Sequence, residues 1–251
     1  MPYRIDISCP PHDALDRLVQ LGALDIEPFS GGLAAIMPDA VTPDAVADAL
    51  GVVGVTVSSA VARDDGSVWL LSPPAIRIGS VALQLIDSTA FGTGHHPTTA
   101  LCIEALEEAV TIAVPDSVLD VGTGSGVLAV AALIMGVSRA VGLDVDAGAL
   151  EIAAEHARLN NLTSRLELVL GGPGAVADTW PLVVANILAA PLIEMAPVLV
   201  RRVGTSGRLI LSGIPWSLES EVRQTYERFG MRHIRSETRA GWTVVVLHAS
   251  W

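Results

Sequence analysis

The chain has 251 residues, of which 51% are hydrophobic, 17% charged and 4% aromatic, a composition that excludes intrinsic disorder. This length suits one medium-sized domain with a smaller companion. The formal net charge is −12 and all 15 basic residues are Arg, so the composition argues against a general DNA or RNA binder and favours a basic protein or a small cation as partner.

The first quarter of the chain is predicted to alternate short strands and helices. Strands are expected over residues 3–8, 23–29, 33–37 and 52–61, and helices over 12–21 and 43–50. The order βαββαβ predicts a small ferredoxin-like α+β domain over residues 1–62, with a two-layer module of another pairing order as the alternative. Eight acidic residues and two Arg give this domain a net charge of −6.

Residues 63–86 are expected to be a short linker with entry strands, and residues 87–251 a second domain that alternates long helices with apolar strands. Helices are expected over 98–109, 126–135, 147–160, 192–202 and 218–229. Strands are expected over 117–120, 140–144, 166–170, 182–185, 208–212, 232–238 and 243–248. This alternation predicts an α/β fold with a parallel sheet covered by helices on both faces, and an antiparallel hairpin at its edge.

A glycine-rich turn follows the first strand of this second domain. Asp120 ends the strand, and Gly122 and Gly124 lie in the turn that opens the next helix. Glycines let backbone N–H groups approach a ligand, and a helix N-terminus favours an anionic group. Asp144 ends the next strand, 22 residues after Gly122, where a carboxylate can accept both hydroxyls of a ribose. The pattern predicts a nucleoside-containing cofactor, with a plain strand-to-helix turn as the alternative, and Val127 in place of a third glycine weakens an NAD interpretation.

Four motifs in this order resemble one family of class I S-adenosylmethionine-dependent methyltransferases. They are FGTGHHPTT at 91–99, the turn at 120–126 with Asp144, NILAAPL at 186–192 and LILSGI at 209–214. Over about residues 75–248 the chain is similar to the ribosomal protein L11 methyltransferase (PrmA) family. The resemblance implies a Rossmann-like methyltransferase sheet, and the ferredoxin-like domain fits the family's substrate-recognition domain in type.

The resemblance also implies which residues contact S-adenosylmethionine. The hydroxyls of Thr98 and Thr99 would cap the helix that follows the 91–95 loop and reach the methionine end of the cofactor. Asn186 is the implied catalytic residue, because its side-chain carbonyl can accept a hydrogen bond from an incoming amine, with a helix N-cap as the alternative role. The implied cofactor contacts are Phe91, Thr93, Thr99, Asp120, Gly122, Thr123, Gly124, Asp144 and Asn186.

Other polar side chains have simpler interpretations. His95 and His96 lack the further ligands that zinc needs, so we expect no metal and a positioning role within their loop. Glu104, Glu107 and Glu108 are expected to form a solvated helical face. No residue is identified as a general base.

Several features indicate a soluble cytoplasmic protein with no membrane partner. Cys9 and Cys102 are too far apart in sequence for the disulfide framework of a small secreted domain. The first residues lack the basic and apolar pattern of a signal peptide. The longest apolar stretch, residues 127–137, is shorter than the roughly 20 residues that span a bilayer.

We therefore expect an S-adenosylmethionine-dependent methyltransferase that acts on lysine side-chain or N-terminal amines of ribosomal protein L11, which the acidic first domain would attract. The linker is shorter than in the resembling family, and this leaves open a different protein, a peptide or a small-molecule amine as the acceptor. A non-catalytic cofactor-binding protein and an NAD-dependent oxidoreductase are the alternatives from other classes.

Overall fold

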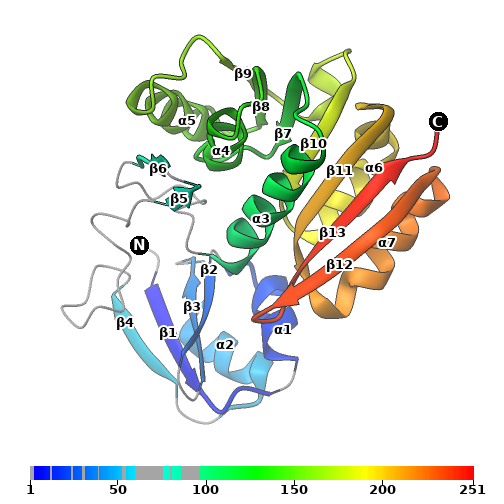
Figure 1. Cartoon of the computed structure of the whole chain (residues 1–251). Helices are drawn as coiled ribbons and strands as arrows, with labels where there is room; N and C mark the ends of the chain where they lie inside the picture. Colours follow the sequence, from blue (N-terminus) through cyan, green and yellow to red (C-terminus); the bar gives the residue numbers. More distant parts are fainter. Residues whose placement is uncertain are drawn as a thin grey trace. The chain divides into compact units, whose positions relative to one another are not determined.

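The computed structural model describes residues 3–11, 13–23, 25–29, 32–38, 40–52, 55–59, 76–79, 81–85 and 96–251. The chain forms two compact units, Met1–Leu71 and Ser72–Trp251 (Figure 1). Most of the predicted linker lies outside the described residues. The assignment of residues 1–62 to substrate recognition, 63–86 to a linker and 87–251 to cofactor binding therefore stays a prediction.

The smaller unit contains a four-stranded antiparallel sheet and two helices. Its elements are β1 (Tyr3–Ser8), α1 (Ala14–Gln20), β2 (Asp25–Phe29), β3 (Gly32–Met37), α2 (Pro43–Leu50) and β4 (Thr56–Ser59). The strand order β2-β3-β1-β4 places β1 between β3 and β4, as a split βαβ arrangement requires. The hydroxyl of Thr42 caps α2 by accepting a hydrogen bond from the backbone of Ala45, and Ile5, Ile7 and Leu18 are fully buried.

The larger unit is built on a seven-stranded sheet in the order β12-β13-β11-β10-β7-β8-β9, and a small hairpin of β5 (Ile76–Ile78) and β6 (Val81–Leu83) precedes it. The sheet strands are β7 (Ser117–Val121), β8 (Arg139–Asp144), β9 (Leu166–Leu170), β10 (Trp180–Asn186), β11 (Val203–Pro215), β12 (Met231–Arg239) and β13 (Trp242–Ala249). The strands from β11 to β9 are parallel, whereas β13 runs antiparallel to both of its neighbours, β11 and β12. The predicted α/β class with a Rossmann-like sheet and an edge hairpin is confirmed.

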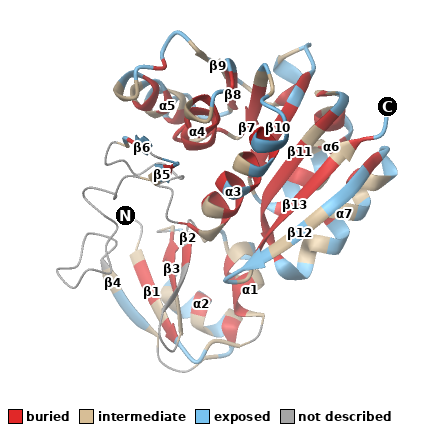
Figure 2. Cartoon of the chain, in the orientation of Figure 1, coloured by how far each residue is buried: buried red, intermediate tan, exposed pale blue. Residues whose placement is uncertain are grey.

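Helices cover both faces of this sheet. They are α3 (Pro97–Ile112), α4 (Val127–Ile134), α5 (Ala147–Leu159), α6 (Ala189–Val200) and α7 (Glu219–Arg228). On β10, Val184 packs in the apolar cluster that contains α3 and α4, and Val183 packs in the cluster that contains α6 and α7. Central strands buried on both faces consist of continuous apolar runs, whereas the edge strand β12 is largely exposed (Figure 2). Within the described ranges, no helix combines the length and apolar character needed to cross a membrane.

Most element boundaries differ from the predicted ones by a few residues, and two of these differences have clear local reasons. The helix α3 begins at Pro97 because proline is favoured at the first helical position and His96 provides the N-cap. The strand β11 continues to Pro215, beyond the predicted end at residue 212. Its pairing with β13 shifts between Leu211 and Ile214, and Gly213 supplies the bend with a φ of +79°.

Candidate cofactor-binding site

The predicted site residues meet at a switch point in the strand order. The chain runs from β7 to β8 and β9 on one side of the sheet, and then places β10 on the other side of β7. Open α/β sheets bind ligands outside the carboxyl ends of the strands at such points. The glycine turn follows β7, Asp144 ends β8 and Asn186 ends β10, so the fold brings all three to one edge of the sheet.

Asp120 holds the glycine turn through hydrogen bonds to its side-chain carboxylate. Its buried carboxylate accepts hydrogen bonds at Oδ2 from the Thr123 hydroxyl at 2.7 Å and from the Ala129 backbone at 3.1 Å. Burial raises the pKa of Asp120 from 3.8 to about 6, although both hydrogen bonds lower it. This geometry ties the turn to the first residues of α4, so Asp120 supports the turn whether or not it touches a ligand.

The turn requires glycine at two positions for steric reasons. Gly122 and Gly126 have φ angles of +70° and +77°, which disfavour any side chain. A Cβ at Gly122 would lie 2.3 Å from Cγ2 of Ile187, and one at Gly126 would lie 2.8 Å from Cβ of Ala153. The turn is therefore packed against the loop after β10 and against α5.

Asp144 is held in place by the same turn. Its Oδ2 accepts a hydrogen bond from the Gly124 backbone at 2.8 Å, and its Oδ1 accepts one from the Asp146 backbone at 3.0 Å. Each carboxylate oxygen has a second lone pair available for a further donor. The carboxylate is thus fixed in orientation and can still accept both hydroxyls of a ribose.

Thr99 and Asn186 each present a buried polar atom that lacks a hydrogen-bond partner among the described residues. The atoms are Oγ1 of Thr99, in the first turn of α3, and Oδ1 of Asn186, at the end of β10. Buried polar atoms are nearly always paired, so such atoms at one site fit a polar ligand. The N-cap of α6 is Leu188, so the alternative role of Asn186 as a helix cap is wrong.

Exposed apolar side chains lie at the same strand ends. Val145 follows β8 and is 80% exposed, Leu170 ends β9 at 59%, and Leu188 follows β10 at 42%. Single exposed apolar side chains are common on protein surfaces, and these three lie at the carboxyl ends of nearby parallel strands, the end at which Asp144 lies. They suit the base of a nucleoside whose ribose Asp144 would bind.

His96 has a structural role that sequence reasoning missed. Its Nδ1 accepts a hydrogen bond from the Thr98 backbone at 3.3 Å, which makes His96 the N-cap of α3. The predicted capping by the hydroxyls of Thr98 and Thr99 is wrong, because these residues lie inside the helix. The His96 ring also packs edge-on against Trp242 with centroids 5.2 Å apart. Since Nδ1 accepts, the proton of the neutral ring lies on Nε2, and Pro97 at the first helical position was the signal for this cap.

The remaining predictions concern residues outside the described part of the chain and the acidic face of α3. Phe91 and Thr93, like His95, lie outside the described residues. Glu104 and Glu108 are exposed, as expected of a solvated face, and each also forms an ion pair, with Arg239 and Arg235 respectively. Where the chain is described, no group of three or more His, Cys, Asp or Glu residues is placed to hold a metal ion.

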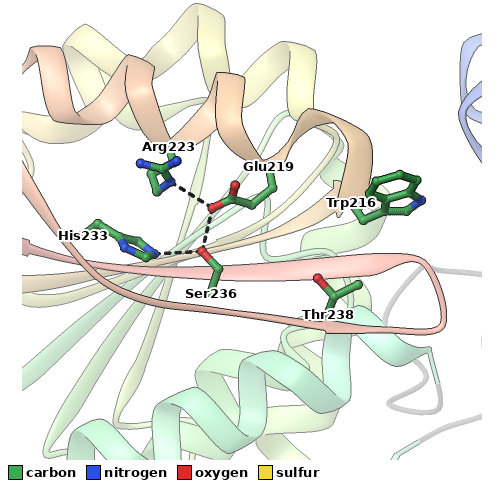
Figure 3. A pocket seen from close by; sticks show the side chains of 6 residues that line it. All are labelled: Trp216, Glu219, Arg223, His233, Ser236 and Thr238. Carbon is green, nitrogen blue, oxygen red and sulfur yellow. Dashed lines mark hydrogen bonds and ion pairs between the residues drawn. The ribbon is translucent and has the colours of Figure 1, made fainter.

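A second concave feature lies between α7 and β12. This open groove of about 600 Å³ is lined by Trp216, Glu219, Arg223, His233, Ser236 and Thr238 (Figure 3). Ser236 donates to Glu219 at 2.7 Å and lies 2.8 Å from Nε2 of His233. Because its proton already points to a carboxylate, the serine accepts from His233 and is not an activated nucleophile. The groove lacks the chemistry of the switch-point site.

The larger unit has the fold of Rossmann-like methyltransferases. An O-methyltransferase family protein from Burkholderia thailandensis shares the fold with a TM-score of 0.52 and 12% sequence identity, over 59% of this chain and 55% of that chain. The profile of the family described as "Ribosomal protein L11 methyltransferase (PrmA)" matches residues 72–250. The chain belongs to the PrmA family.

Individual relatives support this assignment. The chain is 41% identical over 174 residues to a ribosomal protein L11 methyltransferase of Geobacter sulfurreducens. The matched region covers 69% of this chain and 56% of that protein. It is 34% identical over 210 residues to one of Pelobacter propionicus, at 76% and 68% coverage. A ribosomal protein L11 methylase from Lactobacillus delbrueckii subsp. bulgaricus matches with a TM-score of 0.61 and 30% identity, over 66% of this chain and 83% of that chain. The chain thus spans little more than half the length of the Geobacter relative.

Proposed function

We propose that this chain is an S-adenosylmethionine-dependent N-methyltransferase that modifies lysine side-chain or N-terminal amines of ribosomal protein L11. The observation that carries the proposal is the set of groups at one sheet edge: the glycine turn, Asp144 fixed by Gly124, and the unpaired atoms of Thr99 and Asn186. The family match over residues 72–250 supports the same cofactor and the same acceptor.

Different residues at this edge would bind different parts of the cofactor. S-adenosylmethionine supplies the electrophilic methyl group when it is bound. Asp144 would accept the ribose hydroxyls, and Val145 would cover the base. The hydroxyl of Thr99 and the side chain of Asn186 would bind the methionine end, and Asp120 would act through the turn that it anchors. Phe91, Thr93, Gly122, Thr123 and Gly124 complete the proposed contacts.

Asn186 is the residue that we assign to the acceptor amine. A lysine amine has an ordinary pKa near 10.4, so it becomes a nucleophile only after it loses a proton, which water can accept. The Oδ1 atom of Asn186 would accept a hydrogen bond from the neutral amine and direct its lone pair toward the methyl carbon. His96 is protonated at Nε2 in its capping geometry and is therefore a donor there rather than a base.

Replacement of Asp144 by Ala tests the cofactor contact. Loss of charged hydrogen bonds to the ribose should cost about 2 kcal/mol, or about 30-fold in the affinity for S-adenosylhomocysteine. Titration calorimetry measures the affinity, with Glu151→Ala as the matched control because Glu151 is an exposed carboxylate on α5. Equal affinity of Asp144→Ala and the parent would refute the assigned contact.

The acceptor is tested by transfer of a labelled methyl group, read by mass spectrometry. The full chain is incubated with labelled S-adenosylmethionine and either ribosomal protein L11 or a mixture of peptides and small amines. We expect label on lysine or N-terminal amines of ribosomal protein L11. Label only on the other amines would favour the alternative acceptor, which the short predicted linker at residues 63–86 motivates. A cytoplasmic location, and the absence of nucleic-acid and membrane partners, stay predictions.

A further inference from the structure

An ion-pair ladder joins α3 to the edge strand β12. The guanidinium of Arg239 donates two parallel hydrogen bonds to the carboxylate of Glu104, each with an N–O distance of 2.8 Å, and we call this bidentate pair the fork. Glu237 bridges Arg239 and Arg235 at 3.1 Å each, and Arg235 reaches Glu108 at 2.7 Å. The two Glu of α3 lie one helical turn apart, and the three residues of β12 alternate along the strand and share one of its faces. The ladder therefore links one helix face to one strand face continuously.

The Arg239–Glu104 fork lies at the end of the ladder nearest to the cofactor site. Arg239 ends β12 and pairs across the hairpin with Trp242, whose ring packs against His96 at the N-cap of α3. Glu104 lies five residues after Thr99 on the same helix. The hairpin tip thus contacts α3 twice, at the N-cap through Trp242 and at Glu104 through Arg239.

We propose that Arg239 and Glu104 are positioning residues for the cofactor site: their fork holds the hairpin tip against α3, which keeps Trp242 packed on His96, the N-cap of the helical turn that presents Thr99. The inference rests on the proposed function, because it takes Thr99 as a cofactor contact. A planar guanidinium with two parallel hydrogen bonds fixes both distance and orientation, which a lysine ammonium does not.

The ion pair between Arg239 and Glu104 is exposed to solvent, so we expect it to affect local geometry more than global stability. The side chains of Arg239 and Glu104 are 44% and 45% exposed, and ion pairs this open to solvent contribute little to global stability. The hydrogen bond from Arg239 is the main cause that lowers the pKa of Glu104, so the carboxylate stays ionised at neutral pH. The fork therefore constrains how the hairpin meets α3 more than whether the unit folds.

A charge-swap cycle tests this role in the full chain. Arg239→Glu and Glu104→Arg should each weaken binding of S-adenosylhomocysteine about tenfold in titration calorimetry, because like charges would push the hairpin from α3. The double variant restores opposite charges at positions 104 and 239 but leaves the new glutamate beside Glu237, so it should bind more tightly than either single variant without reaching the affinity of the parent. Arg239→Lys keeps the charge without the fork and should fall between the parent and Arg239→Glu.

The ion pair at the other end of the ladder, Arg235 with Glu108, provides the control. Arg235→Glu breaks the ion pair with Glu108 and leaves the Arg239–Glu104 pair intact. It should lower the unfolding temperature about as much as Arg239→Glu does. The affinity for S-adenosylhomocysteine should change by less than about threefold. Single variants that bind like the parent, or a double variant no better than the singles, would overturn the positioning role alone. A parent chain that does not bind S-adenosylhomocysteine would overturn the proposed function as well.

Discussion

Replacing Gly213 by Ala should destabilise the larger unit by about 3 kcal/mol or more. The residue has a φ of +79°, and a Cβ there would lie 2.3 Å from the carbonyl oxygen and 3.0 Å from the nitrogen of Ile187. Both are backbone atoms, and the Ile187 nitrogen already donates to the Ser212 carbonyl at 3.1 Å. Relief of the clash must therefore separate the end of β10, with Asn186, from β11.

Urea unfolding measures this loss, and Gly174→Ala is the matched control. Gly174 has no atom within 4 Å of an added Cβ and no positive φ, so its substitution should change the free energy of unfolding by less than about 0.5 kcal/mol. If Gly213→Ala unfolded at the same urea concentration as the parent, the described packing of Ile187 against β11 would be incorrect.

Replacing Asp120 by Asn should remove the loss of stability that ionisation of this buried carboxyl group causes as the pH rises. Burial raises the pKa of Asp120 from 3.8 to about 6, so between these values the native chain keeps a proton that the unfolded chain has released. The contribution of Asp120 to the free energy of unfolding of the parent therefore falls as pH rises through this window, by about 3 kcal/mol in all. Above about pH 6 the full cost of the buried charge persists.

The comparison of two pH values isolates this effect. We expect the stability of Asp120→Asn relative to the parent to be about 2 to 3 kcal/mol more favourable at pH 8 than at pH 4, measured by urea unfolding. The hydrogen bonds from Thr123 and Ala129 favour the ionised form of Asp120, and the pKa of about 6 already includes this preference. A difference between variant and parent that is the same at both pH values would show that Asp120 does not titrate as described.

The parts of the fold and site that could be predicted are those that local patterns specify. The turn at Gly122 and Gly124 follows an apolar strand and opens a helix, and both glycines have the positive φ that such a turn uses. Asp144 and Asn186 were predictable because each ends an apolar strand buried on both faces. Parallel packing then brings the ends of neighbouring strands to one edge without further information.

Contacts between distant parts of the chain could not be predicted. Arg239 and Glu104 are 135 residues apart, and a run of acidic residues on a helix has the same pattern whether it faces water or arginines. The packing of Trp242 against His96 depends in the same way on how the edge hairpin meets α3. Ile187 required glycine both at Gly122 and at Gly213, which only the folded backbone reveals.

The choice of cofactor is tested most directly by thermal unfolding of the full chain with S-adenosylhomocysteine or with NAD. A ligand at about 100 times its dissociation constant stabilises the native state by about 2.7 kcal/mol, which raises the unfolding temperature by several degrees. The proposed S-adenosylmethionine site predicts this rise with S-adenosylhomocysteine and none with NAD. A rise with NAD and none with S-adenosylhomocysteine would contradict it.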